Sequence, residues 1–178
     1  YNLGGPWTEK TIELWFRADE LPIAPGGGEP SERQVIFDQG GTTRGLFIYL
    51  SGTQASNPTE ADLYFVAANV GSDGSGSPWG GLDADSINVK TLIQKDQFYH
   101  VVAVMDGDST DAFGGTLDLY LNGASVGSVG GVGQMYEHTN DGAIAAQNSQ
   151  VKYHDEDSDI GGLGNYFDGI IDDVVLYN

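Results

Sequence analysis

Short apolar segments separated by turn-forming residues run along almost the whole chain. In the first of them, KTIELWFRA, every second residue is apolar (Ile12, Leu14 and Phe16). Successive side chains of a strand point to opposite faces, so this alternation indicates a strand with one buried face. No segment shows the period and the capping residues of a helix. The chain is therefore expected to fold from strands.

The other strand segments predict how these strands pack. They are RQVIFDQ, GLFIYLS, ADLYFVAANV, QFYHVVAVMD, GTLDLYLN, GASVGSV and DGIIDDVVLYN. Several are apolar on both faces, which is typical of inner strands in a packed pair of sheets. Asn122-Gly123 is a hairpin turn of the kind that needs positive φ at both positions. Together they predict an all-β fold: a two-sheet antiparallel β-sandwich, or jelly roll.

Length and composition indicate one domain. The chain has 178 residues, of which 39% are hydrophobic, enough for a substantial core. It contains no apolar run long enough to cross a bilayer and no signal-peptide pattern at its start. Because it opens and closes on strand-like segments, we expect residues 1–178 to be one domain of a larger secreted or surface protein, with neighbouring domains as further partners.

The charge narrows the classes of partner. With 26 acidic and 7 basic residues, the formal charge is -19. Nucleic acids and anionic membranes are bound through Lys and Arg, so neither is expected as a partner. The absence of cysteine excludes disulfides, thiolate nucleophiles and cysteine-ligated zinc.

The long connections are the candidate ligand-binding regions. Residues 19–33, 71–85 and 130–159 exceed hairpin length, and loops of this length in a compact domain are often functional. Trp79 lies in the Gly-rich segment GSPWGG, where an exposed indole could stack on a sugar ring or fold back as an anchor. Tyr136 and His138 are the corresponding candidates in 130–159, with surface histidines as the plainer interpretation.

The order of the segments resembles a known family. KTIELWFRADEL, FYHVVAVMDGD, LYLNG and the closing IGGLGNYFDGIIDDVVLYN follow one another as in bacterial laminin-G-like, concanavalin-A-like jelly rolls. The resemblance implies two curved antiparallel sheets, often a structural Ca²⁺ ion, and a role in carbohydrate binding or adhesion. It does not identify the ligand, because ligand residues in this family lie in variable loops.

The adjacent Asp172 and Asp173 interrupt the last strand. Alternation predicts that one points inward and the other into solvent, and a buried carboxylate needs a partner. The resemblance implies Asp172 as a calcium ligand. The alternative is that Asp172 accepts hydrogen bonds from a backbone N–H or a tyrosine hydroxyl.

A second acidic group, Asp155, Asp157 and Asp159, occupies alternate positions. It is not an EF-hand, because Ile160 stands where that loop needs glycine. Calcium bound by a different loop geometry and a solvated acidic loop are the two interpretations.

No catalytic motif is evident. No strand segment carries the pair of carboxylates that a hydrolase of this shape places on one strand. A polysaccharide lyase would need an arginine with a His–Tyr pair, and no arginine stands beside such a pair in the sequence. We therefore expect a non-enzymatic, calcium-containing module that binds polysaccharide or cell-surface glycan through 71–85 and 130–159. A structural spacer or protein-interaction domain is the alternative, and a glycan-active enzyme domain is the second alternative.

Overall fold

The computed structural model describes residues 3–24, 33–41, 44–54, 56–69, 86–111, 114–148, 150–155, 158–159 and 162–178. Strands account for all the regular structure in these ranges. They are β1 (Glu9–Ala18), β2 (Arg33–Asp38), β3 (Arg44–Gly52), β4 (Glu60–Asn69), β5 (Ser86–Gln94), β6 (Phe98–Asp106), β7 (Gly115–Leu121), β8 (Ala124–Val132), β9 (Ala143–Ile144), β10 (Gln147–Asn148), β11 (Val151–Lys152), β12 (Ser158–Asp159), β13 (Leu163–Gly164) and β14 (Gly169–Tyr177). Nothing in the described part of the chain is a helix able to span a membrane.

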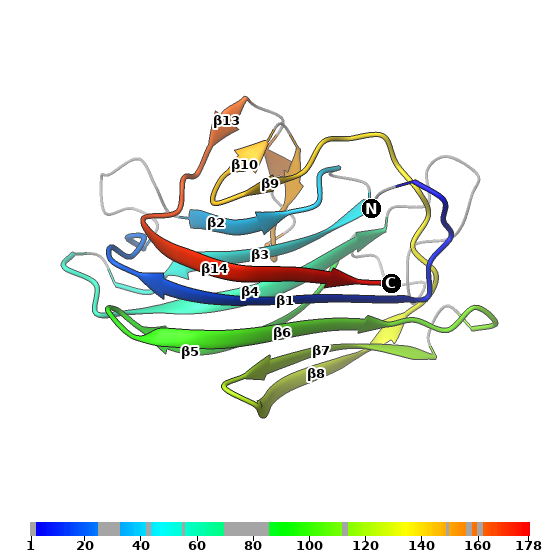
Figure 1. The fold of residues 1–178 in the computed structure, drawn as a ribbon, viewed down its shortest axis with the longest axis horizontal. Helices are drawn as coiled ribbons and strands as arrows, with labels where there is room; N and C mark the ends of the chain where they lie inside the picture. The colour runs from blue at the N-terminus through cyan, green and yellow to red at the C-terminus, as the bar shows by residue number, and fades with distance from the viewer. Residues whose placement is uncertain are drawn as a thin grey trace.

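Two antiparallel sheets stack on each other, as expected for a β-sandwich (Figure 1). The first has the strand order β14-β1-β6-β7-β8, and the second β5-β4-β3-β2-β9. The first and last long strands, β1 and β14, pair with each other. Two short ribbons, β10 with β13 and β11 with β12, lie beside the second sheet.

The main core fills the space between the sheets. In β1, Ile12, Leu14 and Phe16 have no exposed surface, so the alternation seen in the sequence gives the buried face correctly. They pack with apolar residues of the second sheet such as Ile48 and Phe65. Removing this surface from water is the main stabilising contribution to a fold of this kind.

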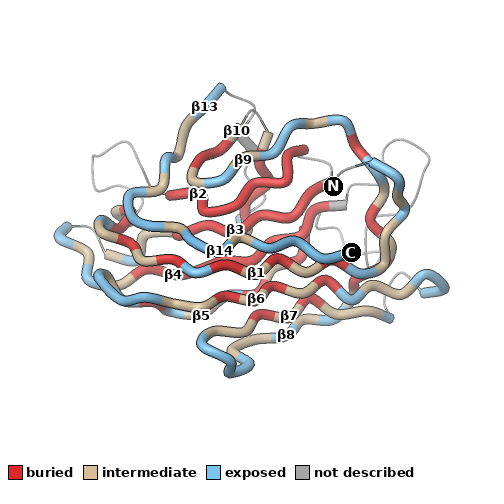
Figure 2. The backbone as a smooth tube through the Cα atoms, viewed as in Figure 1, coloured by how far each residue is buried: buried red, intermediate tan, exposed pale blue. Residues whose placement is uncertain are grey.

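The two sheets differ in what covers their outer faces. A second cluster on the outer face of the second sheet includes Phe47, Tyr49 and Val66, and Val151 and Tyr153 pack onto it. The central strands β2 and β3 are therefore buried on both faces (Figure 2). In the first sheet, β1 and β6 alternate between buried residues and residues that are half-buried or exposed. The outer face of the first sheet is thus the one that reaches solvent.

The turn prediction is confirmed, whereas one strand and one long connection differ from what the sequence predicts. Asn122 and Gly123 both have positive φ, 52° and 79°, as the hairpin between β7 and β8 requires. The sequence pattern misses β5, in which the buried Ile87, Val89 and Ile93 alternate with Asn88, Lys90 and Leu92 on the other face. The segment 130–159 is not one long loop, because it contains the end of β8 and the short strands β9 to β12.

Candidate functional site

Trp15 lies on the solvent-facing side of the first sheet. It has the opposite parity to Ile12, Leu14 and Phe16 in β1, so its indole points away from the core and is 42% exposed. A tryptophan inside an apolar segment such as KTIELWFRA is expected to belong to the core, and for Trp15 this expectation is wrong. Its cross-strand neighbours are His100 in β6 and Asp172 in β14. We call the outer side of β14, β1 and β6 around this residue the Trp15 face.

A hydrogen-bonded frame holds the residues next to Trp15. The His100 ring stacks on the indole, with centroids 4.8 Å apart and planes inclined by 29°. Glu13 accepts hydrogen bonds at both carboxylate oxygens, from His100 Nε2 at 2.9 Å and from the Tyr177 hydroxyl at 3.1 Å. The carboxylate can only accept, so the His100 proton lies on Nε2. The bond to Glu13 raises the pKa of Tyr177.

Exposed apolar side chains surround this frame. Phe98 is 50% exposed and Ile170 is 41% exposed, and both lie opposite Arg17 in the register. Val175 and Tyr177 continue the same side along β14. Isolated exposed apolar residues are ordinary, but a contiguous group on one face is typical of a binding surface.

The two adjacent aspartates of β14 do not follow the alternation of inward and outward side chains along a strand. A β-bulge places Asp173 and Val174 opposite Leu14, and Asp173 takes a positive φ of 49°. The extra residue lets Val174 pack against the core while both aspartates are exposed. The prediction that one aspartate points inward is therefore wrong. Asp172 accepts a hydrogen bond of 2.9 Å from the Asp173 backbone N–H, which matches the alternative stated for it.

The aspartates predicted to bind calcium are not gathered into one group in the described part of the chain. Asp155 forms an ion pair with Arg33, which already supplies a countercharge. Asp157 lies outside the described residues, as does the side chain of Asp159. Among the residues that are described, no three His, Asp or Glu side chains gather closely enough to hold a metal ion. Calcium at Asp155, Asp157, Asp159 or Asp172 therefore stays a prediction.

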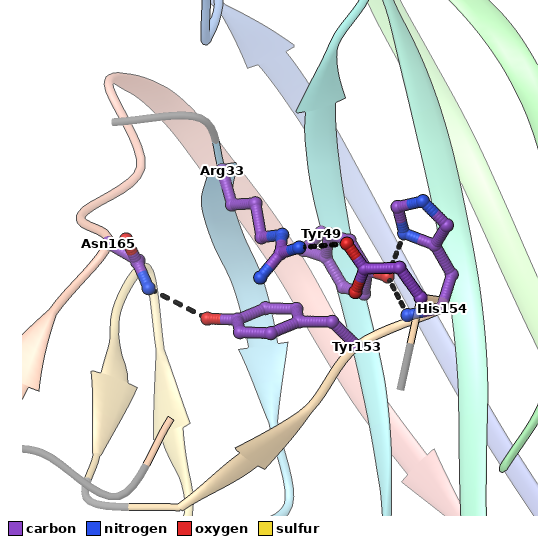
Figure 3. A network of polar contacts seen from close by, with 6 residues as sticks. Arg33, Tyr49, Tyr153, His154 and Asn165 are labelled. Atoms are coloured by element: carbon purple, nitrogen blue, oxygen red, sulfur yellow. Dashed lines mark hydrogen bonds and ion pairs between the residues drawn. The ribbon is translucent and has the colours of Figure 1, made fainter. Parts of the chain in front are cut away.

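A polar network on the outer face of the second sheet brings arginine, histidine and tyrosine side chains together, a combination that is not evident from the sequence. The Tyr49 hydroxyl lies 2.8 Å from His154 Nδ1 and accepts a hydrogen bond of 2.7 Å from the His154 backbone N–H (Figure 3). The Arg33 guanidinium lies 3.9 Å from the centre of the Tyr153 ring. The statement that no arginine accompanies a His–Tyr pair is wrong for the folded chain.

The burial of this network indicates a structural role. Tyr49 and Tyr153 are 0% and 1% exposed, so neither hydroxyl can reach a polysaccharide in solvent. Burial raises the pKa of Tyr49 and lowers that of His154. Asn165 Nδ2 also donates to the Tyr153 hydroxyl at 2.7 Å. These contacts attach residues 151–155 to the sheet, with both tyrosine hydroxyls buried and the His154 ring half-buried.

Two of the three predicted ligand residues of the connections, Tyr136 and His138, lie in the described part of the chain, and neither is fully exposed. Trp79 lies outside the described residues. Tyr136 is half-buried, with its ring centre 5.6 Å from the Arg44 guanidinium carbon. His138 is 9% exposed, and neither ring nitrogen has a hydrogen-bond partner among the described residues. The plainer expectation, that His138 is a surface histidine, is wrong. A ligand in solvent cannot reach this ring in the structure described.

Comparison with family models identifies the fold family. Residues 6–178 match the laminin G 3 model of the Concanavalin A-like lectin/glucanases superfamily. The chain belongs to this superfamily. The resemblance inferred from the ordered strand segments is thus confirmed. A search of curated protein sequences found no match.

Solved structures are similar to this lectin/glucanase-superfamily domain at low sequence identity. The botulinum neurotoxin serotype G binding domain is 12% identical with a TM-score of 0.52, over 96% of this chain and 33% of that chain. This chain thus spans a third of the toxin domain's length. A marine PL7 alginate lyase from Zobellia galactanivorans is 11% identical with a TM-score of 0.41, over 97% of this chain and 62% of that chain.

The sequence of this superfamily domain already indicates that Trp15 points to solvent. Trp15 stands at the same parity as Thr11 and Glu13, the polar positions of its strand. Alternation alone therefore assigns it to the solvent side. Its contact with Tyr177 through Glu13 depends on the pairing of β1 with β14, which the sequence pattern does not specify.

Proposed function

We propose that this domain is a carbohydrate-binding module and that the glycan binds on the Trp15 face. The observation that carries the proposal is the exposed indole of Trp15 on a strand of the sandwich, held against His100 and bordered by Glu13. An aromatic ring offers a flat apolar surface to the C–H face of a sugar. Carboxylate and imidazole groups beside it can bond to the ring hydroxyls.

The frame around Trp15 also reduces the cost of binding. Glu13 is fixed by two hydrogen bonds, and β1 is paired on both sides by β14 and β6. A site built on paired strands loses little conformational freedom when a ligand binds. Membership of a lectin and glucanase superfamily supports a glycan as the ligand. A secreted or cell-surface setting is part of the same proposal, and so is adhesion to a polysaccharide.

The test compares tryptophan variants in a glycan array, followed by isothermal titration calorimetry on the glycans that bind. We expect Trp15→Ala to abolish binding, because stacking on the indole is lost. Tyr166→Ala is the matched control, since Tyr166 is 62% exposed and lies outside the Trp15 face. Circular dichroism and the melting temperature confirm that each variant is folded.

Three outcomes would contradict parts of this proposal. Binding that survives Trp15→Ala but is lost in Trp79→Ala would move the site to the 71–85 connection. Absence of binding to any glycan at millimolar concentration would favour the spacer or protein-interaction alternative. Hydrolysis or elimination products in the glycan samples would restore the enzyme alternative.

A further inference from the structure

The distribution of charge around Trp15 points to a class of glycan. The outward positions of the first sheet carry the carboxylates of Glu9, Glu13, Asp106, Asp118 and Asp172. Asp172 lies directly opposite Trp15 in the register, and Glu9 lies opposite Asp106. A ligand stacked on Trp15 therefore lies beside Asp172 and Glu13, and only an extended ligand that follows β1 also reaches Glu9 and Asp106.

Positive charge on the same side is scarce and already paired. Arg17 is the only lysine or arginine among the outward residues of the strands described for this sheet. Its Nε donates to Asp19 at 2.7 Å. Lys10, the other cation of β1, points inward, where its ammonium lies 3.9 Å from the centre of the Trp7 ring. Among the described outward residues of this sheet, an anionic ligand would thus meet several carboxylates and a single cation, Arg17, which already pairs with Asp19.

The net charge of the whole chain reinforces this local pattern. At -19 the domain repels polyanions over distances set by the ionic strength. An uncharged sugar has no net charge for this field to repel, so its approach to Trp15 is not opposed in the same way.

We infer, on the basis of the proposed function, that the Trp15 face selects uncharged glycans and rejects polyanionic ones such as uronate polymers or sulfated chains. Apart from Glu13, the carboxylates are not contacts to the glycan in this inference. Trp15 supplies the contact, and the surrounding negative charge decides which glycan can approach it. The selectivity should therefore depend on salt, whereas stacking itself should not.

The experiment titrates the domain with matched hexasaccharides, cellohexaose and laminarihexaose as neutral ligands and a hexa-uronate as the anionic ligand. At an ionic strength of about 0.01 M, where screening extends over roughly 30 Å, we expect the hexa-uronate to bind at least about tenfold more weakly. At about 1 M the screening length falls to roughly 3 Å and the difference should shrink.

A charge variant connects the selectivity to this face. Asp172→Asn removes a negative group beside Trp15 and should raise hexa-uronate affinity roughly two- to fivefold, the range of a single exposed charge pair, with little effect on the neutral ligands. Asp141→Asn, an exposed acid outside this sheet, is the matched control and should change neither affinity.

The outcomes separate this inference from the proposed function. Equal or tighter binding of the hexa-uronate, still abolished by Trp15→Ala, would overturn the charge inference and leave the glycan site in place. A preference for neutral ligands that does not change with salt or with Asp172→Asn would also overturn it. Failure of both ligand classes to bind would remove the proposed function itself.

Discussion

His138 makes the stability of this domain sensitive to mild acid. The ring is 9% exposed, and neither nitrogen has a hydrogen-bond partner among the described residues. Burial, followed by the positive charges of Lys10 and Arg44, lowers the pKa of His138 from 6.5 to about 4. Because the folded form binds the proton less readily than the unfolded chain, stability is complete above the unfolded pKa. It falls as the pH drops from there towards 4.

The two pKa values fix the size of this effect. The full difference of 6.5 to about 4 corresponds to about 3 kcal/mol of unfolding free energy. At pH 4.5 most of this stability is already lost, and at pH 5.5 about 1 kcal/mol is lost. For a domain with a total stability of about 5–15 kcal/mol this is a large fraction.

The assay is urea unfolding of the wild type and of His138→Leu, followed by tryptophan fluorescence at several pH values and constant ionic strength. Leucine fills the site without a titrating group, so between neutral pH and pH 4.5 the variant should lose about 2 kcal/mol less stability than the wild type. Burial also raises the pKa of Asp38 to about 6. That titration is present in both proteins and cancels in their difference. Thr139→Leu, an exposed neighbour, is the control. Parallel stability curves for wild type and His138→Leu would refute this reasoning.

Three further predictions concern the network, a turn and calcium. Tyr49→Phe removes the hydroxyl that binds His154 at 2.7 and 2.8 Å and should cost about 1–3 kcal/mol in urea unfolding, whereas Tyr166→Phe on the surface should cost nothing measurable. Gly123→Ala places a Cβ on a residue with φ of 79° and should lower the free energy of unfolding by about 1–2 kcal/mol. A Cβ added at Gly162 would have no atom within 4 Å, so an equal loss of stability in Gly162→Ala would contradict this cause. Calcium held by the carboxylates of 155–159 predicts a higher melting temperature with Ca²⁺ than with EGTA, and equal temperatures would count against it.

The sequence predicts the sandwich well because strand alternation and turn chemistry are local properties. The parity of Ile12, Leu14 and Phe16 gives the buried side of β1, and Asn122-Gly123 gives the hairpin. Alternation fails at Asp172 and Asp173, because a bulge adds one residue and changes the parity along β14. A bulge depends on the partner strand, and nothing in the order of residues around it specifies that partner.

The networks escape prediction for a different reason. Arg33, Tyr49 and His154 are far apart in the sequence and meet only because residues 151–155 pack onto β3. The burial of His138 likewise depends on where the segment after β8 runs. Such contacts follow from topology, which the composition and spacing of short segments do not determine.

The unequal covering of the two sheets explains why the Trp15 face is the better candidate for binding. On the second sheet, Val151 and Tyr153 complete a buried cluster, and the Tyr49–His154 bonds hold this cover in place. Opening that cover to admit a ligand would expose Tyr49 and leave buried polar groups without partners, at a cost of about 1–3 kcal/mol for each group. On the first sheet Trp15 is already 42% exposed, so a sugar needs no rearrangement to reach it. Variants that loosen the cover, such as Tyr49→Phe, should therefore lower stability without lowering glycan affinity. A loss of affinity in Tyr49→Phe at a temperature where it remains folded would show that the second sheet contributes to binding.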